Sequence, residues 1–438
     1  TMGGNLINYP NDVGTNTATL LLIKIFLNSV ISTPGARFTS IDLANFYLMT
    51  PLKRPEFAKI KLSDIPEEII QEYQLHKKAT PDGWIYIRCI RSMYGLPQAG
   101  SLGHDLLEKR LNEAGYHQSP IVPGLWKHTT RPIQFSLVVN DFGVKYTSRN
   151  DANHLIDTLK KHYDVSVDDT GHKYVKINLD WDYNKGKVHL SMAPFCDKAL
   201  KCFENFTPSI LQDSPHPHMP PNYGAHVQMI HTDTSQPVEK VQQKHLQQVL
   251  GTLVWYGHGV DSSILTALST LALQQTKPTT QTMTRLKQLL DYIASQDPAV
   301  ITYRKSNMIY SIHSDAGYLN EANARSRAGG HHYLSDNQPF LPNNGAILTV
   351  SEIIKAVMSS AAEAELGALY VNARKGVEIR NILEELGHRQ PPTPIQTDNS
   401  TAESIINSGV QPKQTKAMDM RFHLLHDRNI NQNQFRFF

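Results

Sequence analysis

The chain has few cysteines, and no two of them are close enough in the sequence to form a typical metal-binding pair. Among its 438 residues only Cys89, Cys196 and Cys202 are cysteine, and no two form a CxxC pair. The sequence therefore supports neither a disulfide-stapled scaffold nor a cysteine zinc site, and it favours a reducing compartment.

Long apolar runs are also missing. The most apolar early stretch, residues 19–30, contains Lys24 and Asn28 and is too short to span a bilayer. We expect a buried helix there, no signal peptide and no membrane partner. The chain starts Thr1-Met2 and stops within an apolar run at Phe438, so we expect both ends to be cuts through a longer sequence.

The chain carries only a small excess of positive charge. The net charge is +3 and 40% of the residues are hydrophobic. Such a composition is typical of a soluble protein with a real core, and the length predicts two to four domains. The surplus of basic residues is too small to indicate a nucleic-acid partner without knowledge of where those residues lie.

Helical and strand patterns alternate along the chain, which predicts an α/β fold. We expect helices at 18–29, 154–163, 243–274, 282–294 and 359–386. We expect strands at 37–41, 84–89, 135–139, 142–146, 174–181, 188–192, 300–304, 308–314, 330–334, 394–397 and 434–438. A proline-rich segment, 214–222, with the polar run to Pro237 is the best linker, and Ser400 is a candidate cap for the helix after it.

Acidic residues gather at two of these strand ends. Asp42 ends one strand, and Asn140 and Asp141 lie at the tip of a hairpin. Carboxylates on adjacent strand ends can hold two Mg²⁺ ions about 3.5–4 Å apart for phosphoryl transfer. Acids are also common as ordinary turn residues, so these positions alone leave both interpretations open.

Three longer segments decide between them. Residues 38–48, 93–100 and 138–146 resemble, in order and spacing, the catalytic and nucleotide-positioning motifs of copia-type retrotransposon reverse transcriptases. The resemblance runs from Gly3 essentially to the end of the chain. It implies that Asp42, Asn140 and Asp141 occupy the catalytic positions, with both Asp residues as metal ligands. It also implies a steric gate, a nucleotide contact and two loop-shaping residues, namely Tyr47, Gln98, Pro97 and Gly100.

The same resemblance exposes departures from the family pattern. Asn140 stands where an Asp is expected, and an amide oxygen brings no negative charge to a Mg²⁺ site. Lys176 stands where a Gly is expected in the segment that resembles the primer-gripping hairpin, and its side chain would obstruct the primer backbone. The chain also starts after the strands expected to supply the basic fingers residues. We therefore expect polymerase activity to be strongly reduced or absent.

A second acidic set lies in the last third of the chain. Asp315 ends a strand, Glu365 opens the long helix and Asp398 ends the next strand. A glutamate at a helix start can simply interact with the helix dipole, but the three together resemble the two-metal site of the family's ribonuclease H domain. We prefer Glu365 to Glu363, because the apolar helix face begins directly after it. A fourth family carboxylate is expected beyond the chain end, and Asp419 is expected to be structural or substrate-facing.

Histidines are abundant, with twenty in the chain, but none forms a metal-binding spacing. His216 and His218 lie in the proline-rich segment, and His331 and His332 lie in an expected strand. We expect all four to be solvated or packed side chains.

The resemblance implies a palm-and-fingers polymerase fold followed by a ribonuclease H-like mixed-sheet α/β domain. Expected domains are 1–205 (fingers and palm), 206–297 (linker and helical connection) and 298–438 (ribonuclease H-like). Expected cofactors are Mg²⁺, two per active site, with Mn²⁺ as a substitute. Expected partners are an RNA template, a DNA primer, an RNA–DNA hybrid and deoxynucleoside triphosphates, in a cytoplasmic particle.

Three classes of function stay open at this point. The first is an RNA-directed DNA polymerase with ribonuclease H activity and an impaired polymerase. The second is a catalytically inactive nucleic-acid-binding remnant of such an element. The third is an unrelated two-domain α/β protein whose motifs are accidental. Salt-dependent binding to a primer–template hybrid separates the third class from the others, because phosphate contacts release counterions.

Overall fold

The computed structural model describes residues 3–4, 7, 9–10, 12–203, 207–217, 233–338, 342–408 and 419–438. Two compact units divide the chain. Unit 1 contains Thr1–Thr19 and Arg37–Thr170, and unit 2 contains Leu20–Ala36 and Gly171–Phe438. The units thus interleave along the chain, whereas the three expected domains are consecutive ranges, and those domain boundaries stay a prediction.

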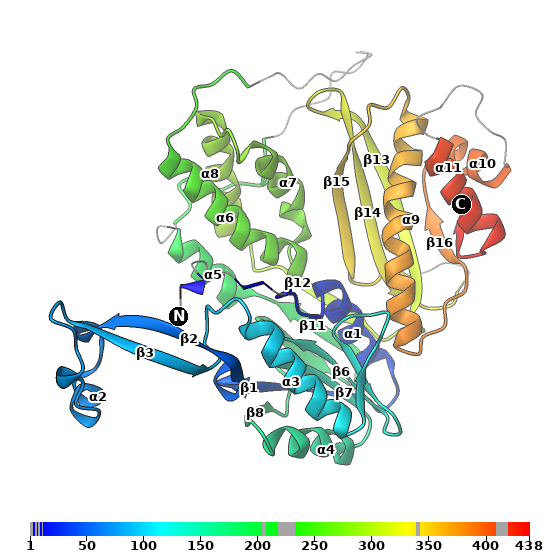
Figure 1. The fold of residues 1–438 in the computed structure, drawn as a ribbon. Helices are drawn as coiled ribbons and strands as arrows, with labels where there is room; N and C mark the ends of the chain where they lie inside the picture. The colour runs from blue at the N-terminus through cyan, green and yellow to red at the C-terminus, as the bar shows by residue number, and fades with distance from the viewer. Residues whose placement is uncertain are drawn as a thin grey trace. The chain divides into compact units, whose positions relative to one another are not determined.

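Unit 1 is built on a six-stranded antiparallel sheet with the order β4-β5-β6-β7-β1-β8 (Figure 1). Its strands are β1 (Arg37–Ala44), β4 (Tyr116–Gln118), β5 (Leu125–His128), β6 (Ile133–Val138), β7 (Asp141–Tyr146) and β8 (Asp164–Asp168). Two helices, α3 (Ala99–Glu113) and α4 (Arg149–Lys160), bury leucines against the same aromatic cluster of the sheet. That shared core holds the strand ends that carry Asp42 and Asp141.

A long hairpin leaves this sheet after the short helix η2 (Phe46–Met49). Its strands are β2 (Pro51–Lys61) and β3 (Trp84–Arg91), which pair only with each other. Three short helices connect them: η3 (Leu62–Asp64), α2 (Glu67–Glu72) and η4 (Leu75–Lys77). Strand β3 was predicted, but β2 was not, because two prolines and four basic residues hide its alternation.

Unit 2 begins with α1 (Leu20–Ser32), which packs on a four-stranded sheet of order β12-β11-β10-β9. These strands are β9 (Lys173–Tyr174), β10 (Ile177–Asp182), β11 (Lys187–Ser191) and β12 (Val300–Arg304). The helices that follow β11 are α5 (Ala193–Cys202), α6 (Lys240–Gly259), η5 (Ser262–Ile264), α7 (Leu265–Gln274) and α8 (Thr280–Ser295). The predicted helical region is confirmed, with a break at Asp261, whose side chain caps η5.

The rest of unit 2 is a five-stranded mixed sheet of order β15-β14-β13-β16-β17 (Figure 1). Its strands are β13 (Ile309–Glu321), β14 (Arg325–Ser335), β15 (Leu348–Ile354), β16 (Thr393–Gln396) and β17 (Phe435–Phe437). The helices are α9 (Ala361–Glu385), α10 (Ser400–Ser408), α11 (Asp419–His426) and η6 (Asp427–Asn431). Strands β13 to β15 are antiparallel, whereas β16 and β17 run parallel to β13, and α9 packs on β13 and β14. The expected α/β class with a mixed sheet in this part of the chain is confirmed.

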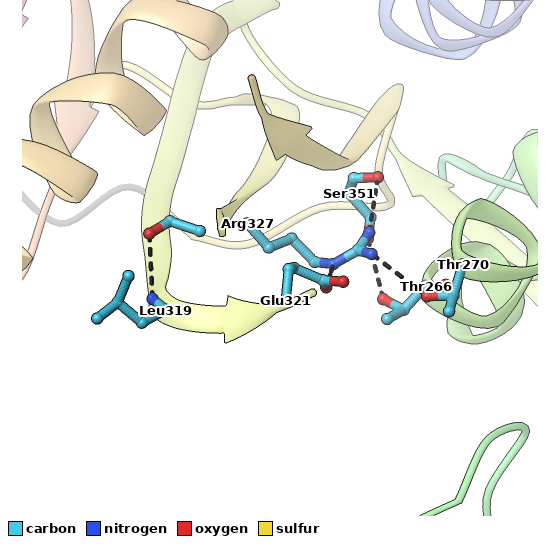
Figure 2. A network of polar contacts seen from close by, with 7 residues as sticks. Thr266, Thr270, Leu319, Glu321, Arg327 and Ser351 are labelled. Carbon is cyan, nitrogen blue, oxygen red and sulfur yellow. Dashed lines mark hydrogen bonds and ion pairs between the residues drawn. The ribbon is translucent and has the colours of Figure 1, made fainter. Parts of the chain in front are cut away.

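A buried arginine ties helix α7 to this sheet (Figure 2). Arg327 forms an ion pair with Glu321 at 2.5 Å and donates to the hydroxyl of Ser351 at 3.0 Å. It also reaches the hydroxyl of Thr270 on α7 at 3.4 Å. A buried charge needs such partners to offset its lost hydration, so this network fixes one end of the β13–β14 hairpin.

Four local expectations were wrong. Asp315 lies inside β13, which continues to Glu321, rather than at the end of a strand. Asp42 lies inside β1 rather than after it, since β1 continues to Ala44. The expected strand 174–181 is broken between β9 and β10 by Val175 and Lys176, which both have positive φ. Asn399, not Ser400, caps α10, because the Asn399 Oδ1 accepts the backbone N–H of Ala402 at 3.0 Å.

Other expectations fall partly outside the described residues. His218 and most of the expected linker lie there, as does the backbone just before Asp419. None of the helices in the described part of the chain combines the length and apolarity that a bilayer crossing needs. The three cysteines are free, two of them buried.

Candidate active sites

The first acidic set comes together at the end of the β1–β7 pair in unit 1. Asp42 and Asp141 lie directly opposite each other in the antiparallel register. Asn140 is next to Asp141 in the two-residue turn between β6 and β7, and its Nδ2 donates to the Asp42 Oδ1 at 2.7 Å. The fold therefore brings all three predicted catalytic positions of this set into one cluster.

The turn that carries Asn140 is strained. Val139 has a φ of 58°, a left-handed conformation that β-branched residues rarely adopt. Asn140 is anchored there by a second hydrogen bond, from Nδ2 to the backbone oxygen of Leu43 at 3.2 Å. Strain of this kind persists only when the surrounding structure holds it in place, and it is concentrated at functional sites.

Asn140 also changes the electrostatics of the cluster. An Asp at this position would set a second carboxylate against Asp42, and the pair would need a cation to offset the repulsion. The amide instead donates a hydrogen bond to that carboxylate. One oxygen of the Asp42 carboxylate therefore already has a hydrogen-bond partner within the protein, which the sequence alone did not reveal.

The predicted nucleotide-contacting residues surround the base of the β2–β3 hairpin. Tyr47 packs edge-on against Tyr94 with ring centroids 4.9 Å apart, and burial, followed by Tyr94, raises the pKa of its hydroxyl. Pro97 lies in the turn before α3, and Gly100 lies in the first turn of α3. A Cβ at Gly100 would meet nothing closer than Thr15 at 3.5 Å, so its immediate surroundings leave room for a side chain.

Gln98 is buried rather than open to solvent. Its side chain is 2% exposed, and its Nε2 donates to the Oε1 of Glu56 at 3.0 Å. The Gln98 amide oxygen has no hydrogen-bond partner, which is uncommon for a buried polar atom. The sequence interpretation missed Glu56, because a single acid in a basic, proline-containing strand carries no motif.

The second acidic set also comes together, in unit 2. One carboxylate oxygen from each of Asp315, Glu365 and Asp398 lies within 4.8 Å of the others. Asp315 is in β13, and Asp398 follows β16, which pairs in parallel with β13. His313 pairs with Gln396 in this parallel register, so Asp315 and Asp398, each two residues further on, lie side by side. The second turn of α9 adds Glu365.

Glu365 is the buried member of this unit 2 cluster, at 6% exposed. Its Oε1 accepts the backbone N–H of Ala316 at 3.0 Å, and its Oε2 accepts the Thr397 hydroxyl at 3.4 Å. Burial, then the charges of Asp315 and Asp398, raises its pKa to about 7. Three charged oxygens converging at one point are the ligand set that Mg²⁺ and Mn²⁺ prefer, so the residues present fit a divalent cation.

Glu363 caps the N-terminus of α9 and does not face the unit 2 cluster. Its Oε2 accepts the backbone N–H of Ser359 at 2.8 Å, and its own N–H donates to the Ser360 hydroxyl at 3.2 Å. This reciprocal arrangement satisfies the free N–H groups at the start of α9. Glu363 is therefore part of the helix cap, while Glu365 faces the cluster.

A buried polar network, which the sequence did not reveal, connects the helix and strands that carry the acidic residues of the unit 2 cluster. Asn372 of α9 donates to the Ser314 hydroxyl and to the Gly329 oxygen, each at 2.9 Å. Its oxygen faces the Nε2 of His332 at 3.0 Å, and the Nδ1 of His332 faces the Tyr310 hydroxyl at 2.6 Å. Burial lowers the pKa of His332 to about 3, so it is a neutral, packed histidine, as predicted. The network locks α9 to β13 and β14.

Comparisons with known proteins bear on the family of the chain. No family model matches the chain. The Transposon Ty1-ER2 Gag-Pol polyprotein of Saccharomyces cerevisiae is 23% identical over 408 residues, which is 88% of this chain and 22% of the polyprotein. The Ty1-BL Gag-Pol polyprotein of the same yeast is 22% identical over 354 residues, 76% of this chain and 19% of that one. The chain thus spans about a fifth of the length of these relatives.

Two solved structures also resemble it. One is a foamy viral protease-reverse transcriptase in complex with RNA/DNA hybrid, with a TM-score of 0.48 and 12% identity, covering 97% of this chain and 46% of that one. The other is LC11-RNase H1, with a TM-score of 0.22 and 13% identity, covering 30% of this chain and 83% of that one. The family expected from the motifs is confirmed by the curated relatives: the chain is a homologue of Ty1 Gag-Pol polyproteins, which are of the copia type.

Proposed function

We propose that this chain is the polymerase and ribonuclease H region of such a polyprotein, with a working nuclease site and a strongly impaired polymerase site. The observation that carries the proposal is the contrast between the clusters. In unit 2 three carboxylates converge, and burial together with the charges of the two neighbouring carboxylates raises the pKa of Glu365. In unit 1 the Asn140 amide already donates a hydrogen bond to the Asp42 carboxylate.

In the nuclease site each acid has a distinct environment. Asp315 and Asp398 are exposed and open to substrate. Glu365 is oriented by the Ala316 N–H, which keeps one of its oxygens at the cluster. A pair of divalent cations bound here would activate a water and stabilise the leaving oxygen of a phosphodiester. The substrate proposed is the RNA strand of an RNA–DNA hybrid, read through backbone shape rather than base edges.

In the polymerase site Asp42 and Asp141 are the proposed metal ligands. Tyr47 is the proposed steric gate, and Gln98, Pro97 and Gly100 are proposed to shape the nucleotide pocket. A deoxynucleoside triphosphate, an RNA template and a DNA primer would be the substrates. With Asn140 the site lacks one of three charges and holds Asp42 in a hydrogen bond, so transition-state stabilisation should fall steeply.

The alternative function is a catalytically inactive nucleic-acid-binding remnant. The Asn140–Asp42 hydrogen bond favours it for unit 1 alone. At the unit 2 cluster all three carboxylates, Asp315, Glu365 and Asp398, are retained. The hydrogen bonds to Glu365 there come from the Ala316 N–H and the Thr397 hydroxyl, and they do not replace a ligand of the cluster. A hybrid-cleavage assay therefore decides between the two functions.

For the nuclease, Asp398→Asn should reduce hybrid cleavage at least a hundred-fold, because it removes one charged ligand of the cluster. Cleavage of a labelled RNA–DNA hybrid is measured with Mg²⁺ and with Mn²⁺, beside double-stranded DNA as a substrate that should not be cut. Asp297→Asn, an exposed acid in the loop before β12, is the matched control and should cleave as wild type. Cleavage that survives Asp398→Asn, or a wild-type chain that does not cleave, would show that the proposal is wrong.

For the polymerase, Asn140→Asp should increase primer extension at least ten-fold. The substrate is an oligo-dT primer on a poly-A template with Mg²⁺ or Mn²⁺. Asn140→Ala separates the two roles of the amide, since it removes the hydrogen bond to Asp42 without adding a charge, and it should stay as inactive as wild type. Extension by wild type that matches Asn140→Asp would contradict the charge explanation, and so would an Asp variant that remains inactive.

A further inference from the structure

One face of the β2–β3 hairpin has a regular composition that neither acidic cluster uses. In the antiparallel register Phe57 lies opposite Arg88, Lys59 opposite Tyr86, and Lys61 opposite Trp84. Directly opposed residues point to the same face of a sheet, and so do residues two apart on one strand. Each of the three successive pairs on this outer face therefore joins one aromatic and one basic side chain.

The outer face is open to solvent. Phe57 is 73% exposed and Tyr86 is 70% exposed. Lys59, Lys61 and Arg88 are exposed and Trp84 is half-buried. Large aromatic side chains gain free energy from burial, so two that stand in solvent on a regular strand face indicate a binding surface.

The inner face of the same hairpin is already packed. It carries the cross-strand partners Glu56 and Cys89, which are buried. Cys89 belongs to a small core with Leu52, Leu96 and Ala99. Core formation thus accounts for the inner residues but not for the outer six.

The charge of the hairpin strands indicates which kind of partner could bind the outer face. Strands β2 and β3 contain six Lys or Arg residues and one acid, Glu56, which is on the inner face and bonded to Gln98. The Lys59 ammonium stands 4.5 Å from the centre of the Trp84 ring and that of Lys61 stands 5.5 Å from it. Asp82, in the turn before β3, is the acid near Lys59. A surface of this kind attracts an anion that also has flat apolar groups.

We propose that this outer face binds a single strand of nucleic acid. Bases would stack on Phe57, Tyr86 and Trp84, and phosphates would pair with Lys59, Lys61 and Arg88. Aromatic platforms interleaved with basic side chains bind single strands with little sequence preference, because every base has a π-face and every nucleotide a phosphate. Successive pairs recur at about 6.5–7 Å along the strands, which suits an extended chain.

A duplex fits this face less well, since its bases are stacked on each other and offer no free face to an aromatic ring. The location also suits a single strand. The hairpin starts directly after the η2 helix of Tyr47, and at its base Arg91 donates to the Leu48 oxygen at 3.3 Å. The proposal rests on the proposed function in one respect: the natural strand would be the unpaired part of the template next to the polymerase cluster.

The test is fluorescence anisotropy of a 15-nucleotide oligouridine with the full chain, without divalent cations and at several salt concentrations. Phe57→Leu with Tyr86→Leu keeps apolar area but removes two stacking faces. It should weaken binding about ten-fold or more while leaving the salt dependence unchanged. Lys59→Gln with Lys61→Gln should weaken binding and lower the slope of log affinity against log salt by up to about 1.4.

Lys160→Gln with Lys161→Gln is the matched control, since both lysines are exposed on unit 1 far from this hairpin in sequence, and it should leave binding unchanged. Oligouridine affinity that is indifferent to both hairpin pairs would overturn the proposal. So would a dimer, detected by light scattering, that Phe57→Leu with Tyr86→Leu disrupts while oligouridine binding persists. A blunt-ended RNA–DNA hybrid has no single-stranded part, so all these variants should cleave it at the same rate. If none of them cleaves it, that result would count against the proposed nuclease function and not against the single-strand site.

Discussion

Lys24 is the charged side chain of α1, a helix that is largely buried and mostly apolar. It is 4% exposed, and its ammonium donates to the backbone oxygen of His258 at 3.1 Å. Burial lowers its pKa from 10.5 to about 8, which corresponds to a cost on the order of 3 kcal/mol for the charged form. The sequence predicted a buried helix here, but it did not predict that the side chain of Lys24 would be almost fully buried.

The pH dependence of stability follows from that shift. Between pH 8 and 10.5 the unfolded chain holds more protons at Lys24 than the folded chain, so this group makes stability rise with pH across that window. Below pH 8 the full cost of the buried charge is present. Lys24→Met should therefore stabilise the protein by roughly 1–3 kcal/mol at pH 7, and the gain should largely disappear by pH 10.5.

Urea unfolding of wild type and Lys24→Met at pH 7 and pH 10 measures this difference directly. Lys198→Met, an exposed lysine on α5, is the control and should change stability little at either pH. A Lys24→Met gain that is equal at both values would mean that the charge of Lys24 carries no cost.

Residues with a chemical signature were well predicted, and residues that support them were not. Asp42 and Asp141 come together as expected, and so do Asp315, Glu365 and Asp398, because the motifs fix these acids on paired strands and on the helix beside them. Glu56 and Asn372 were missed. Their importance comes from partners that are far away in the sequence, and local patterns carry no information about such partners.

At the scale of elements, the β9–β10 turn is the clearest departure from expectation. The two residues between paired Tyr174 and Ile177 have φ angles of 44° at Val175 and 69° at Lys176. Two-residue hairpin turns with positive φ at both positions favour Asn and Gly. The Gly that the family pattern expects at 176 thus has a conformational reason, besides any contact with a primer.

Lys176→Gly should raise the stability of the chain by roughly 0.5–1.5 kcal/mol. It relieves about 1–2 kcal/mol of left-handed strain and loses a weak cation–π contact of Lys176 with Phe195, at 5.9 Å. Lys173→Gly, in β9 where φ is negative, is the control and should be destabilising by roughly 0.5–1 kcal/mol. Chemical denaturation measures both, and a destabilised Lys176→Gly would show that the turn is not strained.

Several strand and helix positions followed from periodicity where one face is apolar, although α3 and β5 were not predicted. Strand β12 was predicted at its exact bounds and α9 within two residues. Strand β15 and most of the second half of β13 were missed, because charged and small residues interrupt their alternation. Strand β2 was missed for a related reason, since its exposed face carries basic and aromatic side chains rather than a simple polar pattern.

At the scale of the molecule, the two acidic clusters should differ in their affinity for cations. The unit 2 cluster holds three carboxylates within 4.8 Å, whereas in unit 1 an amide hydrogen bond already satisfies Asp42. We therefore expect Mn²⁺ to stabilise the chain mainly through unit 2, by about 2.7 kcal/mol at a hundred-fold excess over its dissociation constant. Asp398→Asn should abolish most of this effect and Asp42→Asn should leave it.

Thermal unfolding with and without Mn²⁺, together with calorimetric titration, measures that difference. Asn140→Asp provides the complementary variant, because it should add a binding event that wild type lacks. Equal losses in Asp42→Asn and Asp398→Asn would mean that the two clusters bind cations alike, against the electrostatic difference described above.

The interleaved course of the backbone has a practical consequence for dissecting the molecule. Residues 20–36 belong to unit 2, although unit 1 residues flank them on both sides. A protein expressed from residue 171 onward would lack α1 and leave bare the apolar surfaces of β11, β12 and α9 on which that helix packs. Such a fragment should aggregate, whereas supplying residues 20–36 as a peptide or by circular permutation should rescue its solubility.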